Sequence, residues 1–151
     1  MNGNLAQFGE DLCLHLARLQ VSLGNINGLF AGGAAARGAD FASRTQELQA
    51  AVKESAERAA ALREALRSGL ERDATLAPET LSRWVSKRQT AQLHARADLI
   101  EQMATVAVEL AALSTVEAER LTVTAIMARR QAIALQVERE NSYDVLVRAD
   151  P

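Results

Sequence analysis

The sequence lacks both glycine and proline over almost all of its second half. Neither residue occurs between Glu79 and Asp150, and five of the eight glycines lie between Gly24 and Gly38. Glycine and proline are the usual interruptions of helices. A long stretch without them that is rich in Ala, Leu, Arg and Glu therefore predicts helix. We expect an all-α fold.

Other absences exclude whole classes of protein. The single cysteine, Cys13, rules out an intrachain disulfide and cannot by itself found a cysteine metal site. Aromatic residues make up only 3% of the chain, so long helix–helix interfaces must replace bulky core side chains. The net charge is −2, with both signs mixed in every segment, which disfavours a nucleic-acid partner.

Targeting signals are also missing. The N-terminus shows no signal-peptide pattern, and the most apolar run, Met103 to Leu113, is interrupted by Glu109. We therefore expect a cytoplasmic protein without a transmembrane segment. Heavy use of Ala and Arg is typical of a bacterial genome rich in G and C.

The positions of the glycines and prolines predict how a single helical domain over residues 1–151 is organised. The expected elements are a helix over 4–23, a Gly-rich linker over 24–40, a helix over 41–73, a turn over 74–77, a helix over 78–113, a helix over 115–140 and a tail over 141–151. Ser114 and Glu117 have capping-box spacing, which would end one helix there, but no Gly or Pro accompanies them. A single helix running through Ser114 is the open alternative.

Apolar residues recur at three- and four-residue steps along each predicted helix, the period of one helix face. In the first helix the stripe is Leu5, Phe8, Leu12, Leu16, Leu19 and Leu23. The second has a heptad-like stripe of Phe41, Leu48, Val52, Ser55, Ala59, Leu62 and Leu66. The third has two stripes, one ending in Leu99, Met103, Val106, Leu110 and Leu113, the other made of Leu93, Ala97, Ile100, Ala104, Ala107 and Ala111. The last predicted helix carries Leu121, Ala125, Ala128, Ala132 and Leu135 on one line and Ile126, Ile133 and Val137 on another. These stripes predict three or four long, mostly antiparallel helices in an oligomeric bundle or coiled coil.

No pattern of catalytic, cofactor-binding or metal-ligating residues emerges. Di-iron bundles need Glu-x-x-His, but Leu12 precedes His15 and Ala91 precedes His94 at that spacing. Asp11 and His15 are two ligands without a third. The run AGGAAARG lacks the GK[ST] ending of a phosphate-binding loop. We expect no enzyme, no cofactor and no metal.

One acidic residue invites a catalytic interpretation, because Glu109 lies inside an apolar run. Polar residues at helical spacing offer a simpler one, in which Glu109 faces water at the end of the series His94, Asp98, Glu101, Thr105 and Glu109. We adopt the second.

Seven apolar or aromatic residues lie where a partner could contact them. Three lie in the Gly-rich linker, one near the start of a helix and three in the tail: Ile26, Leu29, Phe30, Trp84, Tyr143, Val145 and Val147. The three tail residues alternate along the chain, which is a weak signal of an extended strand. The linker residues would otherwise anchor the loop on the bundle.

A short stretch of the second predicted helix, Ser43-Arg-Thr-Gln-Glu-Leu-Gln-Ala-Ala-Val-Lys-Glu-Ser-Ala56, resembles the signalling helices of bacterial chemoreceptors. The resemblance covers little more than a dozen residues, and the receptor tip, sensor and membrane span have no counterpart here. It implies a signalling coiled coil. The overall composition is also similar to that of granule-coating phasins and of coiled-coil secretion chaperones.

The sequence thus favours a non-enzymatic helical interaction protein: an adaptor, chaperone or assembly component that docks helices of a protein partner or of its own copies. An amphipathic, phasin-like coat on lipid or polymer granules is the alternative, because it would use the same stripes. A chemoreceptor-like coiled coil is the third possibility.

Overall fold

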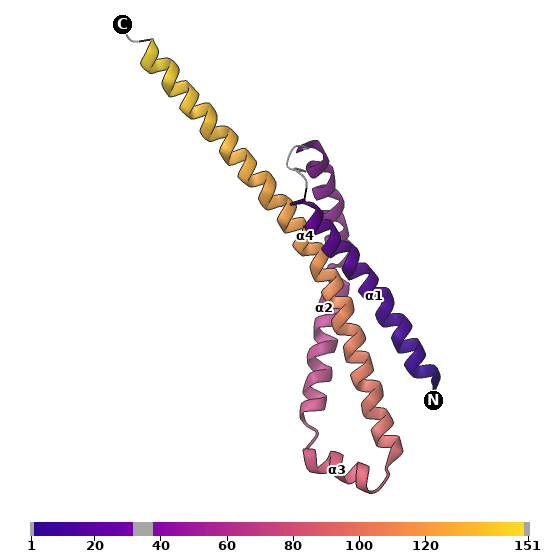
Figure 1. Cartoon of the computed structure of the whole chain (residues 1–151). Helices are drawn as coiled ribbons and strands as arrows, with labels where there is room; N and C mark the ends of the chain where they lie inside the picture. Colours follow the sequence, from indigo (N-terminus) through magenta and orange to yellow (C-terminus); the bar gives the residue numbers. More distant parts are fainter. Residues whose placement is uncertain (1, 32–37, 150–151) are drawn as a thin grey trace.

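The computed structural model describes residues 2–31 and 38–149, and all regular structure in these ranges is α-helical. The elements are α1 (Asn2–Gly28), α2 (Gly38–Ala74), α3 (Pro78–Ser86) and α4 (Thr90–Arg148). α1, α2 and α3 each pack against α4, which is the longest helix. Figure 1 shows α1 and α2 lying along the first part of α4, while the last part of α4 extends alone. The expected all-α fold class is confirmed for the described residues.

Ion pairs set the register between α2 and α4. Three such pairs join the two helices, and their order along one helix reverses along the other: Arg44–Glu119, Arg58–Glu109 and Asp73–Arg96. On the other side of α4, residues of α1 line two grooves together with residues 98–116 of α4. α4 is therefore the element that both long neighbours share.

The core lies where the start of α2 meets the middle of α4. Phe41, Leu48 and Val123 form a buried cluster, and Val123 is fully buried. Four half-buried residues pack against it: Leu29, Val116, Ile126 and Met127. Further along α2, Ala59 and Leu62 are buried as well. The heptad-like stripe predicted for residues 41–66 is thus the face of α2 that turns inward.

The break in the helical second half lies between α3 and α4, not at Ser114. Residues 87–89 leave the helix, and Arg88 has a φ of 51°, a left-handed conformation that is unfavourable for a side chain with a Cβ. This turn lets α3 cross the end of the α2–α4 pair (Figure 1), where Trp84 lines a groove with Leu76 and Leu99. The partial burial of Trp84 in this groove contributes against the strain at Arg88.

The helix predicted over 78–113 is therefore wrong, because residues 87–89 interrupt it. Of the two possibilities left open at Ser114, the structure shows the continuous helix. α4 runs unbroken past Ser114, and the hydroxyl of Thr115 donates to the Ala111 carbonyl one turn earlier, which is compatible with helix. The tail predicted over 141–151, where the alternation of apolar residues is a weak extended-strand signal, is helical up to Arg148. At these two places neither glycine nor proline interrupts the chain, and hydrogen-bonded helix outcompetes a capping box or a short alternating pattern.

The Gly-rich linker predicted over 24–40 is also shorter than expected. α1 continues to Gly28, five residues beyond the predicted end of the helix over 4–23, and α2 begins at Gly38 rather than at 41. The glycines at 24 and 28 each cost about 1 kcal/mol in helix relative to alanine. The half-burial of Ile26 and Leu29 compensates, because Leu29 packs on the core cluster. Residues 32–37 of the predicted linker lie outside the described residues.

Candidate interaction surface and polar network

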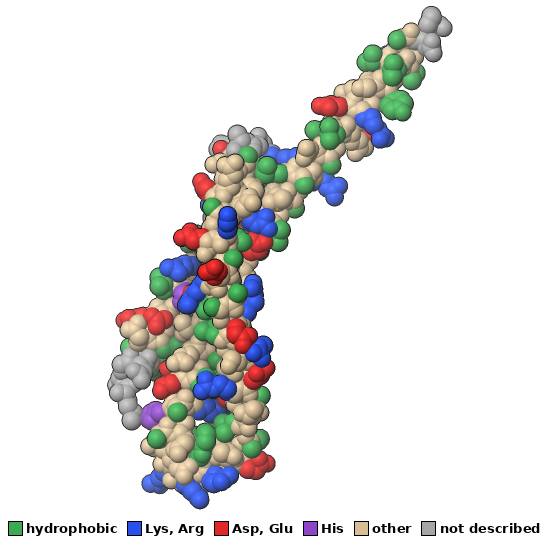
Figure 2. Space-filling model, turned by 180° about the vertical axis from the view of Figure 1, so that it is seen from behind, with side chains coloured by type: hydrophobic (Ala, Val, Ile, Leu, Met, Phe, Trp, Pro, Cys, Tyr) green, Lys and Arg blue, Asp and Glu red, His purple; other side chains and the backbone are tan. Residues whose placement is uncertain are grey.

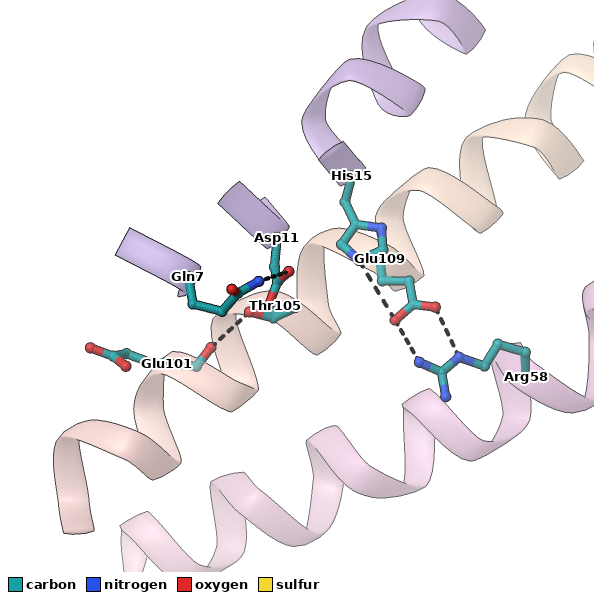
Figure 3. A network of polar contacts seen from close by, with 7 residues as sticks. All are labelled: Gln7, Asp11, His15, Arg58, Glu101, Thr105 and Glu109. Carbon is teal, nitrogen blue, oxygen red and sulfur yellow. Dashed lines mark hydrogen bonds and ion pairs between the residues drawn. The ribbon is translucent and has the colours of Figure 1, made fainter. Parts of the chain in front are cut away.

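A polar network connects three helices in the middle of the bundle (Figure 3). The Glu109 carboxylate accepts two hydrogen bonds from the Arg58 guanidinium, from Nε at 2.8 Å and from Nη2 at 2.8 Å. His15 of α1 lies on the other side, with its Nε2 3.9 Å from Glu109 Oε2. The Glu109 side chain is only 15% exposed, so the expectation that it faces water is wrong. α1 and α2 cover it from both sides.

Electrostatics in this network favour the charged carboxylate. The hydrogen bonds from Arg58 lower the pKa of Glu109 below its usual value of 4.5, although partial burial opposes the shift. Charge attraction from Arg58 and from His15 adds to the lowering of the pKa. A carboxylate held ionised by two directional bonds is suited to fixing the register of three helices.

A prediction for Glu109 follows from this pKa. Because the unfolded chain has the higher pKa, it binds more protons on acidification, so the stabilisation from Glu109 is present above about pH 4.5 and is lost as the pH falls through the folded-state pKa. The Glu109→Gln variant lacks this contribution. We expect its deficit in the free energy of unfolding to be largest at pH 7 and to shrink below about pH 4.5. Urea titrations from pH 3 to 7 measure it, and Glu57→Gln, an exposed control on α2, should show no such convergence.

A second ion pair lies next to the core cluster. The Glu119 side chain is 3% exposed, and its Oε1 accepts hydrogen bonds from Arg44 Nε at 2.9 Å and from Nη2 at 2.7 Å. Arg44 also donates to Glu47 on its own helix. Sequence reasoning missed this pair, because Glu119 lies in a charged run that is typical of a solvated helix face.

Neither polar site offers an evident place for a metal. Among the residues that the structure describes, no group of three or more His, Cys, Asp or Glu side chains could hold an ion. Beside His15, an apolar groove of about 430 Å³ is lined by residues of α1 and α4, among them Leu14, Val21 and Leu113. The His15 Nδ1 is buried without a hydrogen-bond partner in the structure.

An exposed apolar surface lies instead at the end of α4. All side chains of residues 131–148, which we call the free segment, are exposed. Figure 2 shows hydrophobic side chains along this part of the helix. Its large hydrophobic residues are between 48% and 75% exposed: Ile133, Leu135, Val137, Tyr143, Val145, Leu146 and Val147.

The structure separates the predicted contact residues into two groups. Ile26, Leu29 and Trp84 are half-buried, and Leu29 packs on the core cluster, whereas Phe30 is 71% exposed. Tyr143, Val145 and Val147 all lie on the free segment, on a helix instead of an extended tail.

α4 is long and apolar enough in part to be compared with membrane-spanning helices. By length and mean hydropathy alone, one 18-residue window of this helix is apolar enough to cross a membrane, and 11% of the window is buried. Core helices of soluble proteins meet the same criterion, but they are mostly buried, unlike this window. Glu109 and Glu119 place two carboxylates on α4, each paired with an arginine of α2.

Comparisons with known proteins add no relative. No protein-family model, no curated protein and no solved structure matches this chain.

Proposed function

We propose that the protein is a non-enzymatic helical interaction protein, in which the bundle holds α4 rigidly and the free segment docks a partner helix. The observation that carries the proposal is the complete exposure of residues 131–148 together with their large hydrophobic side chains. Contiguous apolar patches of this kind on soluble proteins usually mark interaction sites.

The length of the free segment supports a helix as its partner. It extends about 27 Å at 1.5 Å per residue, which is several turns of helix. A helix without tertiary contacts is only marginally stable in water. A second helix along it would supply the missing contacts and bury its leucines and valines.

The packing of α1 and α2 on α4 would hold the free segment in a fixed direction. In the proposed arrangement α2 is antiparallel to α4, as the reversed order of their ion pairs supports. α1 runs parallel to α4, since residues 7–11 share a groove with residues 98–109 and residues 14–22 share one with residues 109–116. Two helices clamped on the same stretch of α4 fix the direction in which the free segment points.

One observation favours a second candidate function, a coat on lipid or polymer surfaces. Ile133 and Val137 lie on the side of the free segment opposite Leu135 and Leu146, so apolar residues are found on both sides of the helix. A helix lying in an apolar surface would use a broad apolar face. A docked helix needs only one side.

Photo-crosslinking distinguishes these two functions. Benzoylphenylalanine replaces Leu135 in the full-length protein, and a matched variant carries it at Val137 on the opposite side. In cells that make the protein, we expect the probe at position 135 to label an apolar helical segment of a protein at least fivefold more than the probe at position 137. Equal labelling of lipid from both positions would favour the coat, and no labelling from either would contradict both functions.

A further inference from the structure

The continuity of α4 joins two separate apolar stripes into one. From Leu93 onward the steps alternate strictly between four and three residues up to Leu146, which is the a and d spacing of a coiled coil. We call this set the open stripe: Leu93, Ala97, Ile100, Ala104, Ala107, Ala111, Ser114, Ala118, Leu121, Ala125, Ala128, Ala132, Leu135, Arg139, Ser142 and Leu146. None of its residues is buried, and all are exposed from Ser114 onward.

The bundle itself uses the opposite side of α4. In this heptad register, the buried residues Ala112, Glu119 and Val123 occupy b and f positions, and so does Glu109. These positions lie opposite a and d on the helix. From Ala118 onward α1 and α2 therefore leave the coiled-coil face of α4 exposed, although its repeat of 3.5 residues is the one that favours a left-handed supercoil with another helix.

We propose that the open stripe from Leu121 to Leu146 pairs with the same segment of a second copy of this chain, in antiparallel orientation about a two-fold axis between Ile133 and Ala134. This inference rests on the proposed docking function of the free segment and names its partner. The paired length is about 38 Å at 1.5 Å per residue.

The layers of this arrangement are self-complementary. An antiparallel coiled coil sets each a position against a d position of the partner. With the two-fold axis at 133/134, the layers are Leu121 against the partner's Leu146, Ala125 against the partner's Ser142, Ala128 against the partner's Arg139, and Ala132 against the partner's Leu135. Each of the three inner layers contains at least one alanine, and this small side chain lets the two helices approach closely. The leucine pairs close both ends.

Charge decides between the two orientations. A parallel, in-register pair would place Arg139 against Arg139 of the second copy in the same apolar layer. Two like charges in a partly desolvated layer repel each other. In the antiparallel pair each arginine faces an alanine and extends past it into water. On the flanks, no like charges face each other: Arg129 lies near the partner's Gln136, and Glu138 near the partner's Gln131.

The overall shape allows this pairing. The bundle lies along the first part of α4, and the last turns of α4 lie far from it (Figure 1), so the two bundles would stand at opposite ends of the paired helices. The a, d, e and g positions of the segment contribute about 15 residues per copy, fewer than the 20–30 of a standard interface. We therefore expect a dissociation constant on the order of micromolar.

Sedimentation equilibrium between about 1 and 200 µM tests the pairing, with the concentration range set around that affinity. The wild-type mass should rise from 16.3 kDa toward twice that value. Leu135→Asp should weaken dimerisation at least tenfold, because each dimer would bury two unpaired carboxylates. Val137→Asp is the matched control: Val137 is similarly exposed but occupies an f position, so this variant should dimerise like wild type. Circular dichroism checks that both remain helical.

Single cysteines test the orientation in a Cys13→Ser background. Leu121→Cys and Leu146→Cys should each fail to crosslink alone, yet form a disulfide when the two variants are mixed. Crosslinking of each variant alone would overturn the antiparallel pair, and so would a wild-type mass of 16.3 kDa at all concentrations. If the protein is monomeric but the probe at position 135 labels a helix of another protein, this inference fails and the proposed function stands. If that probe labels only lipid, both fail.

Discussion

Replacing Arg44 with methionine is expected to destabilise the bundle by about 3 kcal/mol, whereas replacing its partner Glu119 with leucine should cost less than about 1 kcal/mol. The asymmetry follows from burial. The Glu119 side chain is 3% exposed and the Arg44 side chain is 38% exposed. Without Arg44, a carboxylate stays buried and unpaired next to the core cluster. Without Glu119, the guanidinium can turn to water and keep its bond to Glu47.

The double variant completes the comparison. Arg44→Met combined with Glu119→Leu removes both charges and fills the space with apolar atoms, so its stability should return to within about 1 kcal/mol of wild type. Urea unfolding followed by circular dichroism, with all four proteins at one concentration, measures the cycle. Equal losses for the two single variants would show that the ion pair, rather than the buried carboxylate, governs the effect.

The helical content and the inner face of α2 could be predicted from the sequence. Phe41, Leu48, Ala59 and Leu62 are buried as their heptad-like spacing indicates. α1 was predicted less well, because Leu5, Leu16 and Leu23 of its stripe are exposed while His15 and Ser22 are buried. An apolar stripe identifies the inner face of a helix only where apolar contacts determine the packing. In α1 the contact of His15 with Glu109 shifts that face.

The positions of breaks depend on contacts that spacing does not reveal. Residues 87–89 contain no glycine or proline, yet the chain turns there because α3 must cross the end of the bundle to place Trp84. Ser114 and Glu117 have the spacing of a capping box, but no tertiary contact requires the chain to change direction there, so the helix continues. Breaks without glycine or proline are therefore set by tertiary structure.

The polar network was beyond reach of the sequence for a similar reason. Arg58 is separated from Glu109 by 51 positions and Arg44 from Glu119 by 75. Such pairs become visible only once the register of α2 against α4 is known. The open stripe, by contrast, is present in the spacing itself, and the unbroken course of α4 is what joins its two halves.

Hydrogen exchange along α4 tests the central claim most directly. The claim is that the first part of α4 packs against α1 and α2, while residues 131–148 of the same helix are available to dock a partner. In the Leu135→Asp variant, taken as the undocked protein, amides around residues 99–123 should exchange at least about a thousandfold more slowly than those of residues 131–148, because only the former are held by tertiary contacts. In concentrated wild-type protein, residues 131–148 should become protected. Equal protection of both stretches in the undocked protein would contradict this account, whereas no gain of protection on concentration would overturn the pairing of two copies alone.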